Sequence, residues 1–290
     1  MLSNRLRILG VLVIVFAMPQ VSSGPIVPLK TTQISPRKHA PMRFHGLRPD
    51  RTISSENWSG YTVTGSSFTQ ARGSWRVPTV NCSATPNTYA SFWVGLDGYS
   101  SSTVEQIGTD SDCSNGKPSY YAWYEFYPED AYYAGNLTSL EPGDVMSATV
   151  TYNTTNGKFT ATITDESRPL LAFTTTFTPS GRTGTPKRSS AEWIAEAPCC
   201  SQNGGILPLS DFGTVSLGGD YTSLSSTNDA TDSSTSGPIS HFGNSVEVMT
   251  MVSSEGVDEA VPSSLTPDGT SFTVAWESEG SEKTHTWGQR

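Results

Sequence analysis

The stretch Ser190-Ala191-Glu192-Trp193-Ile194-Ala195-Glu196-Ala197-Pro198 places two carboxylates among apolar residues, in a chain otherwise rich in Ser, Thr and Gly. Side chains of a β-strand alternate between two faces, so Glu192, Ile194 and Glu196 share one face of this strand. The opposite face is entirely apolar (Ala191, Trp193 and Ala195). A strand of this kind packs over a core and presents its acids to a cleft. The alternative is an ordinary amphipathic strand whose acids face solvent.

Alternating apolar residues recur along the chain and predict many short strands. The runs cover residues 89–97, 144–152, 159–163, 171–177, 246–248 and 272–276. Turn dipeptides separate them: Pro-Gly at 142–143, Asn-Gly at 156–157, Gly-Gly at 218–219 and Asp-Gly at 268–269. No segment keeps a helical period. The pattern predicts one all-β domain, a sandwich or a barrel. The polar run 221–237 is predicted to be a surface insertion.

The N-terminal residues have the composition of a secretory signal peptide. Arg5 and Arg7 precede an apolar run at 8–17, and small residues follow at 21–23. This run is too short to cross a bilayer. We therefore predict a secreted, extracellular protein with a signal peptide at 1–23, a pro-segment at 24–51 and a catalytic domain at 52–290.

Charge is divided unevenly between the leader and the domain. Residues 1–51 carry eight Lys/Arg and one Asp, a net charge of +7, whereas residues 52–290 carry ten Lys/Arg and 26 Asp/Glu, a net charge of −16. A basic, Pro-rich leader on an acidic domain indicates a pro-segment that docks electrostatically, and the alternative is a disordered linker. The acidic domain argues against binding of nucleic acid, because phosphates would be repelled.

Four cysteines are consistent with an oxidising compartment. Three pairings are possible, and we favour Cys82–Cys113 because both residues lie in turn-rich segments, whereas Cys199 and Cys200 are adjacent. No Cys/His spacing typical of zinc is present, so no metal and no cofactor are expected.

Several common catalytic arrangements are absent from the sequence. It has no His-Glu-x-x-His, no Gly-x-Ser-x-Gly and no phosphate-binding glycine loop. Beyond residue 52 its only histidines are His241 and His285, neither in a setting typical of a triad. Carboxylates and amides beside aromatic residues remain: Asp97 shares a strand face with Trp93, and Glu125 shares one with Trp123.

Five motifs in order resemble those of the glutamic peptidases, the eqolisins of peptidase family G1. They are Asn57-Trp58-Ser59-Gly60-Tyr61, Trp93-Val94-Gly95-Leu96-Asp97-Gly98, Val104-Glu105-Gln106-Ile107-Gly108-Thr109-Asp110, Trp123-Tyr124-Glu125-Phe126-Tyr127-Pro128 and Ala191-Glu192-Trp193-Ile194-Ala195-Glu196. The resemblance extends over roughly residues 54–276. It implies a sandwich of two curved antiparallel sheets and a secreted acid endopeptidase that is made as a zymogen.

The resemblance also implies site residues. Gln106 matches the catalytic glutamine, and we assign the catalytic glutamate to Glu192, the first acid of its motif. Residues that line or support the cleft are implied at Trp58, Trp93, Asp97, Asp110 and Glu125. Tyr121 stands where some relatives have Asp, and the adjacent Cys199-Cys200 also departs from the pattern.

In the implied mechanism Glu192 takes a proton from the attacking water, and the Gln106 amide stabilises the oxyanion. We expect the two residues on neighbouring strands of one sheet, and Glu196 to be dispensable. Expected partners are protein or peptide substrates and the chain's own pro-segment as inhibitor, on a monomer without membrane contact.

Two other functions fit the residues. A lectin-like glycoside hydrolase would use two carboxylates, such as Glu125 and Glu192, on either side of a sugar. A non-catalytic carbohydrate-binding module would need the aromatic residues alone. The basic leader and the Gln106 motif favour the peptidase.

Overall fold

The computed structural model describes residues 37–181, 183–199 and 205–280, all within one compact unit. The predicted signal peptide, the first part of the predicted pro-segment, Cys200 and the C-terminal tail lie outside the described residues.

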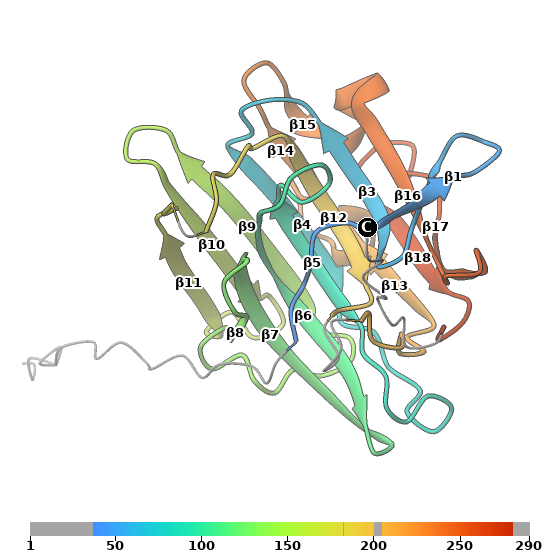
Figure 1. Ribbon diagram of the computed structural model, residues 1–290. Helices are drawn as coiled ribbons and strands as arrows, with labels where there is room; N and C mark the ends of the chain where they lie inside the picture. Colours follow the sequence, from blue (N-terminus) through green and yellow to red (C-terminus); the bar gives the residue numbers. More distant parts are fainter. Residues whose placement is uncertain (1–36, 182, 200–204, 281–290) are drawn as a thin grey trace, which may run out of the picture. The chain divides into compact units, whose positions relative to one another are not determined.

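Two layers of mostly antiparallel strands pack face to face, which confirms the predicted all-β sandwich (Figure 1). The first layer runs in the order β16 (Val246–Val252), β3 (Trp58–Thr64), β12 (Ser190–Glu196), β5 (Ser91–Leu96), β6 (Val104–Ser114), β7 (Lys117–Tyr127) and β8 (Tyr132–Tyr133). The second runs β11 (Ala172–Phe177), β10 (Lys158–Asp165), β9 (Val145–Asn153), β4 (Gln70–Arg76), β13 (Thr214–Leu217), β18 (Phe272–Trp276) and β17 (Asp258–Pro262). Pairing of β17 with β16 joins the layers at one edge.

Short elements complete the described chain. Strand β1 (Phe44–Leu47) pairs with β2 (Ile53–Ser55), and β2 pairs in parallel with β16. The short helical elements are α1 (Gly219–Thr222), a single turn, and the 3₁₀ helix η1 (Ile239–Ser245), which is interrupted by a kink at Gly243. None of the described helices is long and apolar enough to cross a membrane.

The polar run at 221–237 is part of the sandwich, so its prediction as a surface insertion was wrong. Within it, β14 (Asp229–Thr231) pairs with both β4 and β15 (Ser236–Pro238). Its buried hydroxyls are satisfied, since Ser74 Oγ lies 2.8 Å from Thr222 Oγ1 and 2.9 Å from Thr227 Oγ1. Polar residues can be buried when they hydrogen-bond one another, and composition does not reveal such pairs.

The main core lies between the layers, and β12 contributes its apolar face to it, as the opening stretch predicts. Ala191, Trp193 and Ala195 are buried in this core. The opposite, outer face of the first layer is called the front face here, and it carries a second cluster that contains Trp58, Trp93, Trp123 and Ile194. The acids of β12 belong to the front face.

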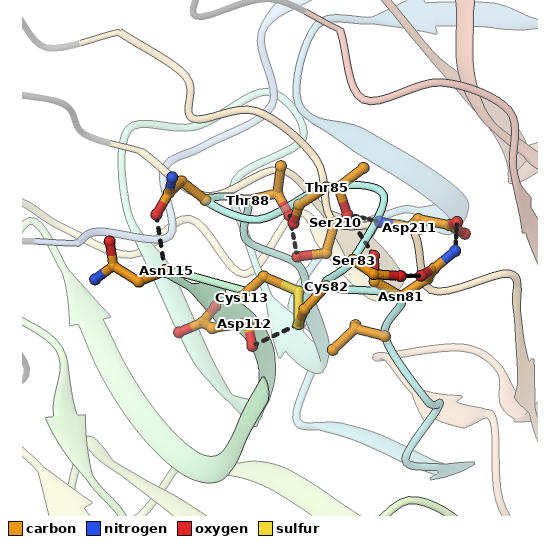
Figure 2. Close-up of a disulfide and its surroundings, with 12 residues drawn as sticks. Asn81, Cys82, Ser83, Thr85, Thr88, Asp112, Cys113, Asn115, Ser210 and Asp211 are labelled. Carbon is orange, nitrogen blue, oxygen red and sulfur yellow. Dashed lines mark hydrogen bonds between the residues drawn. A yellow bond between two sulfur atoms is a disulfide. The ribbon is translucent and has the colours of Figure 1, made fainter. Parts of the chain in front are cut away.

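A disulfide joins Cys82 to Cys113, as predicted, at the end of β6 (Figure 2). It ties this strand to the loop at 81–88, where Thr88 and Cys113 also pair through their backbones. Asp112, whose carbonyl oxygen lies 3.9 Å from Cys82 Sγ, belongs to the candidate site.

Replacing both cysteines by serine is expected to destabilise the fold. The bond closes a loop of 31 residues, for which the loss of chain entropy in the unfolded state predicts about 3–4 kcal/mol. Denaturant unfolding of the Cys82→Ser/Cys113→Ser variant beside the oxidised wild type measures this. An unchanged free energy of unfolding would contradict it.

Candidate active site

Strand register brings the predicted catalytic residues onto one face. Glu192 lies opposite Gly95 of β5, Gly95 opposite Gln106 of β6, and Gln106 opposite Glu125 of β7. Directly paired residues of antiparallel strands point to the same side, so this row lies on the front face. The expectation that β6 and β12 are neighbours was wrong, because β5 separates them.

The next two rows complete the front face. Ile194, Trp93, Gly108 and Trp123 form the middle row, and Glu196, Ser91, Asp110 and Tyr121 form the one beyond it. Gly108 is required here, because an added Cβ would lie 2.5 Å from the Cβ of Trp93. Because glycine has no Cβ, the Trp93 side chain can lie close to β6.

Gln106 is fully buried and contacts the chain's own N-terminal segment. Its Nε2 donates to the carbonyl oxygen of His39 (2.6 Å) and to Glu125 Oε2 (3.1 Å). Its Oε1 makes no hydrogen bond within the described residues. The amide therefore already binds a peptide carbonyl.

Glu125 supports this arrangement from β7. Its Oε2 accepts from the backbone N–H of His39 (2.8 Å) and lies 3.3 Å from the ring Nδ1 of the same residue. Burial raises the pKa of Glu125, although the His39 ring opposes the shift. Glu125 is thus a support for both Gln106 and the bound peptide.

Glu196 lies near this cluster. Its Oε2 accepts from the indole N–H of Trp93 (2.7 Å), and its Oε1 is buried without a hydrogen-bond partner within the described residues. Burial raises its pKa well above the usual range. The charge of His39 lowers this pKa, and those of Glu125 and Asp110 raise it. Glu196 and Gln106 therefore share His39 and Glu125 as neighbours.

Glu192 has different neighbours. It is fully buried. Burial, together with the charges of Asp97 and Glu105, raises its pKa well above the usual value, although the Ser190 hydroxyl lowers it. In the described residues, the Gln106 amide instead donates to His39 and Glu125, and the His39 ring lies beside Asp110 and Glu125. Glu192 therefore belongs to a buried acidic group at the other end of β12.

Asp97 anchors the segment that enters β12. Its carboxylate accepts from the backbone N–H of Arg188 (2.7 Å) and from the N–H (2.9 Å) and hydroxyl (3.1 Å) of Ser189. Asp97 was predicted to line or support the cleft. In the described residues its carboxylate hydrogen-bonds the segment before β12 and not residues 39–40.

Asp110 binds the side chain of His39. Its Oδ1 lies 3.3 Å from His39 Nε2 and accepts from Ser91 Oγ (2.6 Å), and its Oδ2 accepts from the Tyr121 hydroxyl (2.9 Å). Burial alone would raise the pKa of Asp110, but His39 and Arg37 lower it. Conversely, burial opposes charge on His39, but Asp110 and Glu125 raise its pKa to about 10.

The tryptophans form the floor and one end of the site. Trp58 and Trp93 meet edge to face, with ring centroids 4.9 Å apart. Trp58 Nε1 donates to the carbonyl of Ala40 (3.1 Å), which also accepts from Asn57 Nδ2 (3.3 Å). Trp123 stacks flat on the His39 ring, with centroids 3.4 Å apart.

Of the seven site residues predicted from the sequence, Gln106, Trp58, Asp110 and Glu125 contact residues 39–40 directly, and Trp93 contacts Glu196. His39, Asn57 and Asp112 also belong to the site and were not predicted from the sequence. His39 stands directly after two cations in a basic leader, a setting that points to the leader as a whole but does not single out His39. Among the described residues, no group of three His, Cys, Asp or Glu side chains could hold a metal.

Known proteins match much of this chain. A model of the Peptidase A4 family matches residues 56–263. Aspergillopepsin-2 of Aspergillus niger is 30% identical over 183 residues, which cover 56% of this chain and 62% of that protein. Scytalidopepsin B of Scytalidium lignicola is 29% identical over 189 residues, which cover 64% of this chain and 69% of that protein.

Solved structures show the same fold. The aspergilloglutamic peptidase of Aspergillus niger aligns with a TM-score of 0.52 and 28% identity, covering 66% of this chain and 99% of that one. SCP-B, an eqolisin in complex with the tripeptide Ala-Ile-His, aligns with a TM-score of 0.58 and 21% identity, covering 77% of this chain and 98% of that one.

Proposed function

Because this chain belongs to the Peptidase A4 family, we propose that it is a secreted endopeptidase that hydrolyses peptide bonds in acid, with Gln106 and Glu196 as its catalytic pair. One observation carries the proposal: the side-chain amide of Gln106 donates to a peptide carbonyl, that of His39, at 2.6 Å. A peptide substrate would present its scissile carbonyl in the same place.

The proposed roles follow from the two functional groups. The Glu196 carboxylate takes a proton from a water as that water attacks the carbonyl carbon, and later returns the proton to the leaving amine. Gln106 does not titrate, so its N–H can stabilise the oxyanion without a change of charge. The buried Gln106 Oε1 and Glu196 Oε1, both without a protein partner in the described chain, can orient the water.

Glu196 replaces Glu192, our assignment from the sequence, for an electrostatic reason. The charge of Glu196 interacts with that of His39, whose carbonyl Gln106 binds, and with those of Glu125 and Asp110, which lie at the two nitrogens of the His39 ring. That of Glu192 interacts with Asp97 and Glu105 instead. Glu192 does share a row with Gln106, but a proton-transfer group must reach the bound peptide. Of the neighbours of Glu196, Glu125 and Asp110 contact His39 of that peptide.

The same structure supports a zymogen. Gln106, Glu196 and Trp93 are fully buried, and residues 39–40 occupy the face that a substrate would need. We propose that the N-terminal segment inhibits the enzyme while it is attached. Burial is the largest cause of the raised pKa of Glu196, so opening of this face to water would lower that pKa and favour the carboxylate.

Acid is expected to loosen the segment. The pKa of Asp110 is lowered in the occupied site, so its attraction is present above the ordinary value of 3.8 and is lost as the pH falls through the lowered pKa. Burial and Asp110 raise the pKa of Asp112 to about 7. The Asp112 carboxylate therefore becomes protonated below neutral pH, and its attraction to Arg37 weakens. The raised pKa of His39 acts oppositely: its attraction is complete below 6.5 and is lost as the pH rises through about 10.

Hydrogen exchange of the His39 and Cys199 amides in the full-length Glu196→Gln precursor, between pH 3 and 9, tests this pH dependence. After correction for intrinsic exchange, protection of both amides should decrease towards pH 3, while protection of the central amides of β6 stays constant. Constant protection of His39 in acid would contradict the proposed release.

Digestion of a denatured protein at pH 4, beside a panel of polysaccharides, tests the function itself. The peptidase predicts peptides and no sugars. Release of sugars without peptides would favour the glycoside hydrolase, and neither product would favour a binding module.

A further inference from the structure

Residues 38–42 lie on the front face as an added peptide strand. The backbone of Lys38 exchanges two hydrogen bonds with Cys199 (2.5 and 2.8 Å), and the N–H of Met42 donates to the carbonyl of Gly98 (3.1 Å). Between these ends, the front face binds the N–H and carbonyl of His39 and the carbonyl of Ala40. Main-chain binding of this kind holds a peptide in register, and side-chain pockets then give specificity.

The first pocket holds the side chain of His39. The imidazole is fully buried between the ring of Trp123 on its face and the carboxylates of Asp110 and Glu125 at its two nitrogens, each at 3.3 Å. A protonated ring gives both nitrogens a hydrogen to donate, whereas an aliphatic side chain would remove this cation from beside two buried carboxylates. The pocket is therefore complementary to a flat cation.

A second pocket holds the side chain of Arg37, two residues earlier. Its guanidinium bonds Asp112, lies 3.7 Å from Asp110 Oδ2, and lies over the rings of Tyr89 and Tyr121. The Tyr121 hydroxyl donates to both aspartates, which fixes them towards the cation. The intervening Lys38 instead points outward, with its Nζ bound to the carbonyl of Pro128 (2.8 Å) and 3.2 Å from Asp130.

We propose that the site selects peptides with the pattern Arg-x-His before the scissile bond, and that the chain's own Arg37-Lys38-His39 is its first substrate, cut between His39 and Ala40. This inference rests on the proposed function. Water adds across the amide: its oxygen forms the new carboxylate of His39, the C–N bond breaks, and the proton taken up by Glu196 passes to the amine of Ala40.

The cut would leave residues 40–51 attached, so the pro-segment would end at His39 and not near Arg51. The structure favours this shorter segment, because residues beyond it are built into the domain. Strand β1 pairs with β2, and Arg48 Nη1 donates to Asp258 Oδ1 at 2.6 Å. Asn57 also binds the carbonyls of Ala40 and Pro41.

Processing of the full precursor tests the first half of the proposal. After a shift from pH 7 to pH 4, intact mass and N-terminal sequencing should give a chain that begins Ala40-Pro41-Met42, with a rate independent of protein concentration. The Glu196→Gln precursor should stay uncut, and His39→Leu should slow this cut by about thirtyfold or more, as expected for loss of a desolvated charged pair. The matched control, His45→Leu, changes a histidine outside the face and should process normally.

Synthetic peptides test the second half on the processed enzyme at pH 4–5. Relative to Arg-Lys-His-Ala-Pro-Met, we expect kcat/KM to fall about thirtyfold or more for Leu in place of His and about threefold for Ala in place of Arg. Ala in place of Lys should stay within about twofold, because Lys38 lies outside both pockets. In the Asp110→Asn enzyme, the preference for His over Leu should shrink.

The outcomes separate this inference from the proposed function. Digestion of denatured protein together with equal rates on the His and Leu peptides would overturn the specificity, and a first cut at another bond would overturn the self-cleavage. In both cases the peptidase would stand. Failure to digest denatured protein, with or without added peptides, would overturn the peptidase itself.

Discussion

Glu196→Gln is expected to lower kcat on denatured protein by about 10³-fold at pH 4, the range found when a positioned proton-transfer group is lost. Glutamine keeps the size of the side chain and can keep the hydrogen bond from Trp93 Nε1, but it cannot accept the proton of the attacking water. The melting temperature should therefore change little while the rate falls.

Glu192→Gln is the matched control, since it makes the same change on the same strand and face. It removes a buried acid that lies near Asp97 and Glu105, so activity should stay within about threefold of wild type, and stability at pH 7 should not decrease. An inactive Glu192→Gln enzyme beside an active Glu196→Gln enzyme would reverse the assignment and restore the choice made from the motif.

Gln106→Ala is expected to lower kcat by about 10²–10³-fold with little change in KM, as for loss of one oxyanion donor. The hydrogen bond at stake is the one that Gln106 Nε2 now donates to the carbonyl of His39. The equivalent hydrogen bond to a substrate should be stronger in the transition state, because the carbonyl oxygen becomes negative.

Gln106→Glu distinguishes this role from that of a second acid. An ionised carboxylate would repel both the oxyanion and Glu125, which lies 3.1 Å from the amide nitrogen, so activity should not return. Measurements of kcat, KM and the melting temperature of both variants separate the explanations. A full rate in Gln106→Ala would refute the oxyanion role, and loss of stability in parallel with rate would indicate a structural amide.

Much of the fold follows from local patterns in the sequence. Alternating apolar residues in β5, β9, β10 and β12 place one face of each strand in a core, because a strand repeats every two residues. Turn residues separate those strands, and unequal cysteine settings indicated the Cys82–Cys113 bond. The motif around Gln106 likewise identified an amide on the front face.

The proposal that Glu196 accompanies that amide depends on tertiary structure. Glu192 and Glu196 are equivalent by periodicity, since both point to the front face of β12. Their difference arises from what other strands and the N-terminal segment place beside them: Asp97 and Glu105 at one end, His39 and Glu125 at the other. Such neighbours are distant in sequence, so no pattern within β12 contains them.

The same reason applies to His39. As a residue of a basic leader it carried no more information than the cations around it. Its buried position depends on Asp110 of β6 and on Trp123 and Glu125 of β7, each of which follows His39 by more than 70 positions in the sequence. Sequence alone determined that a cationic leader faces an acidic domain, and only the fold decided which cation enters the site and which carbonyl Gln106 binds.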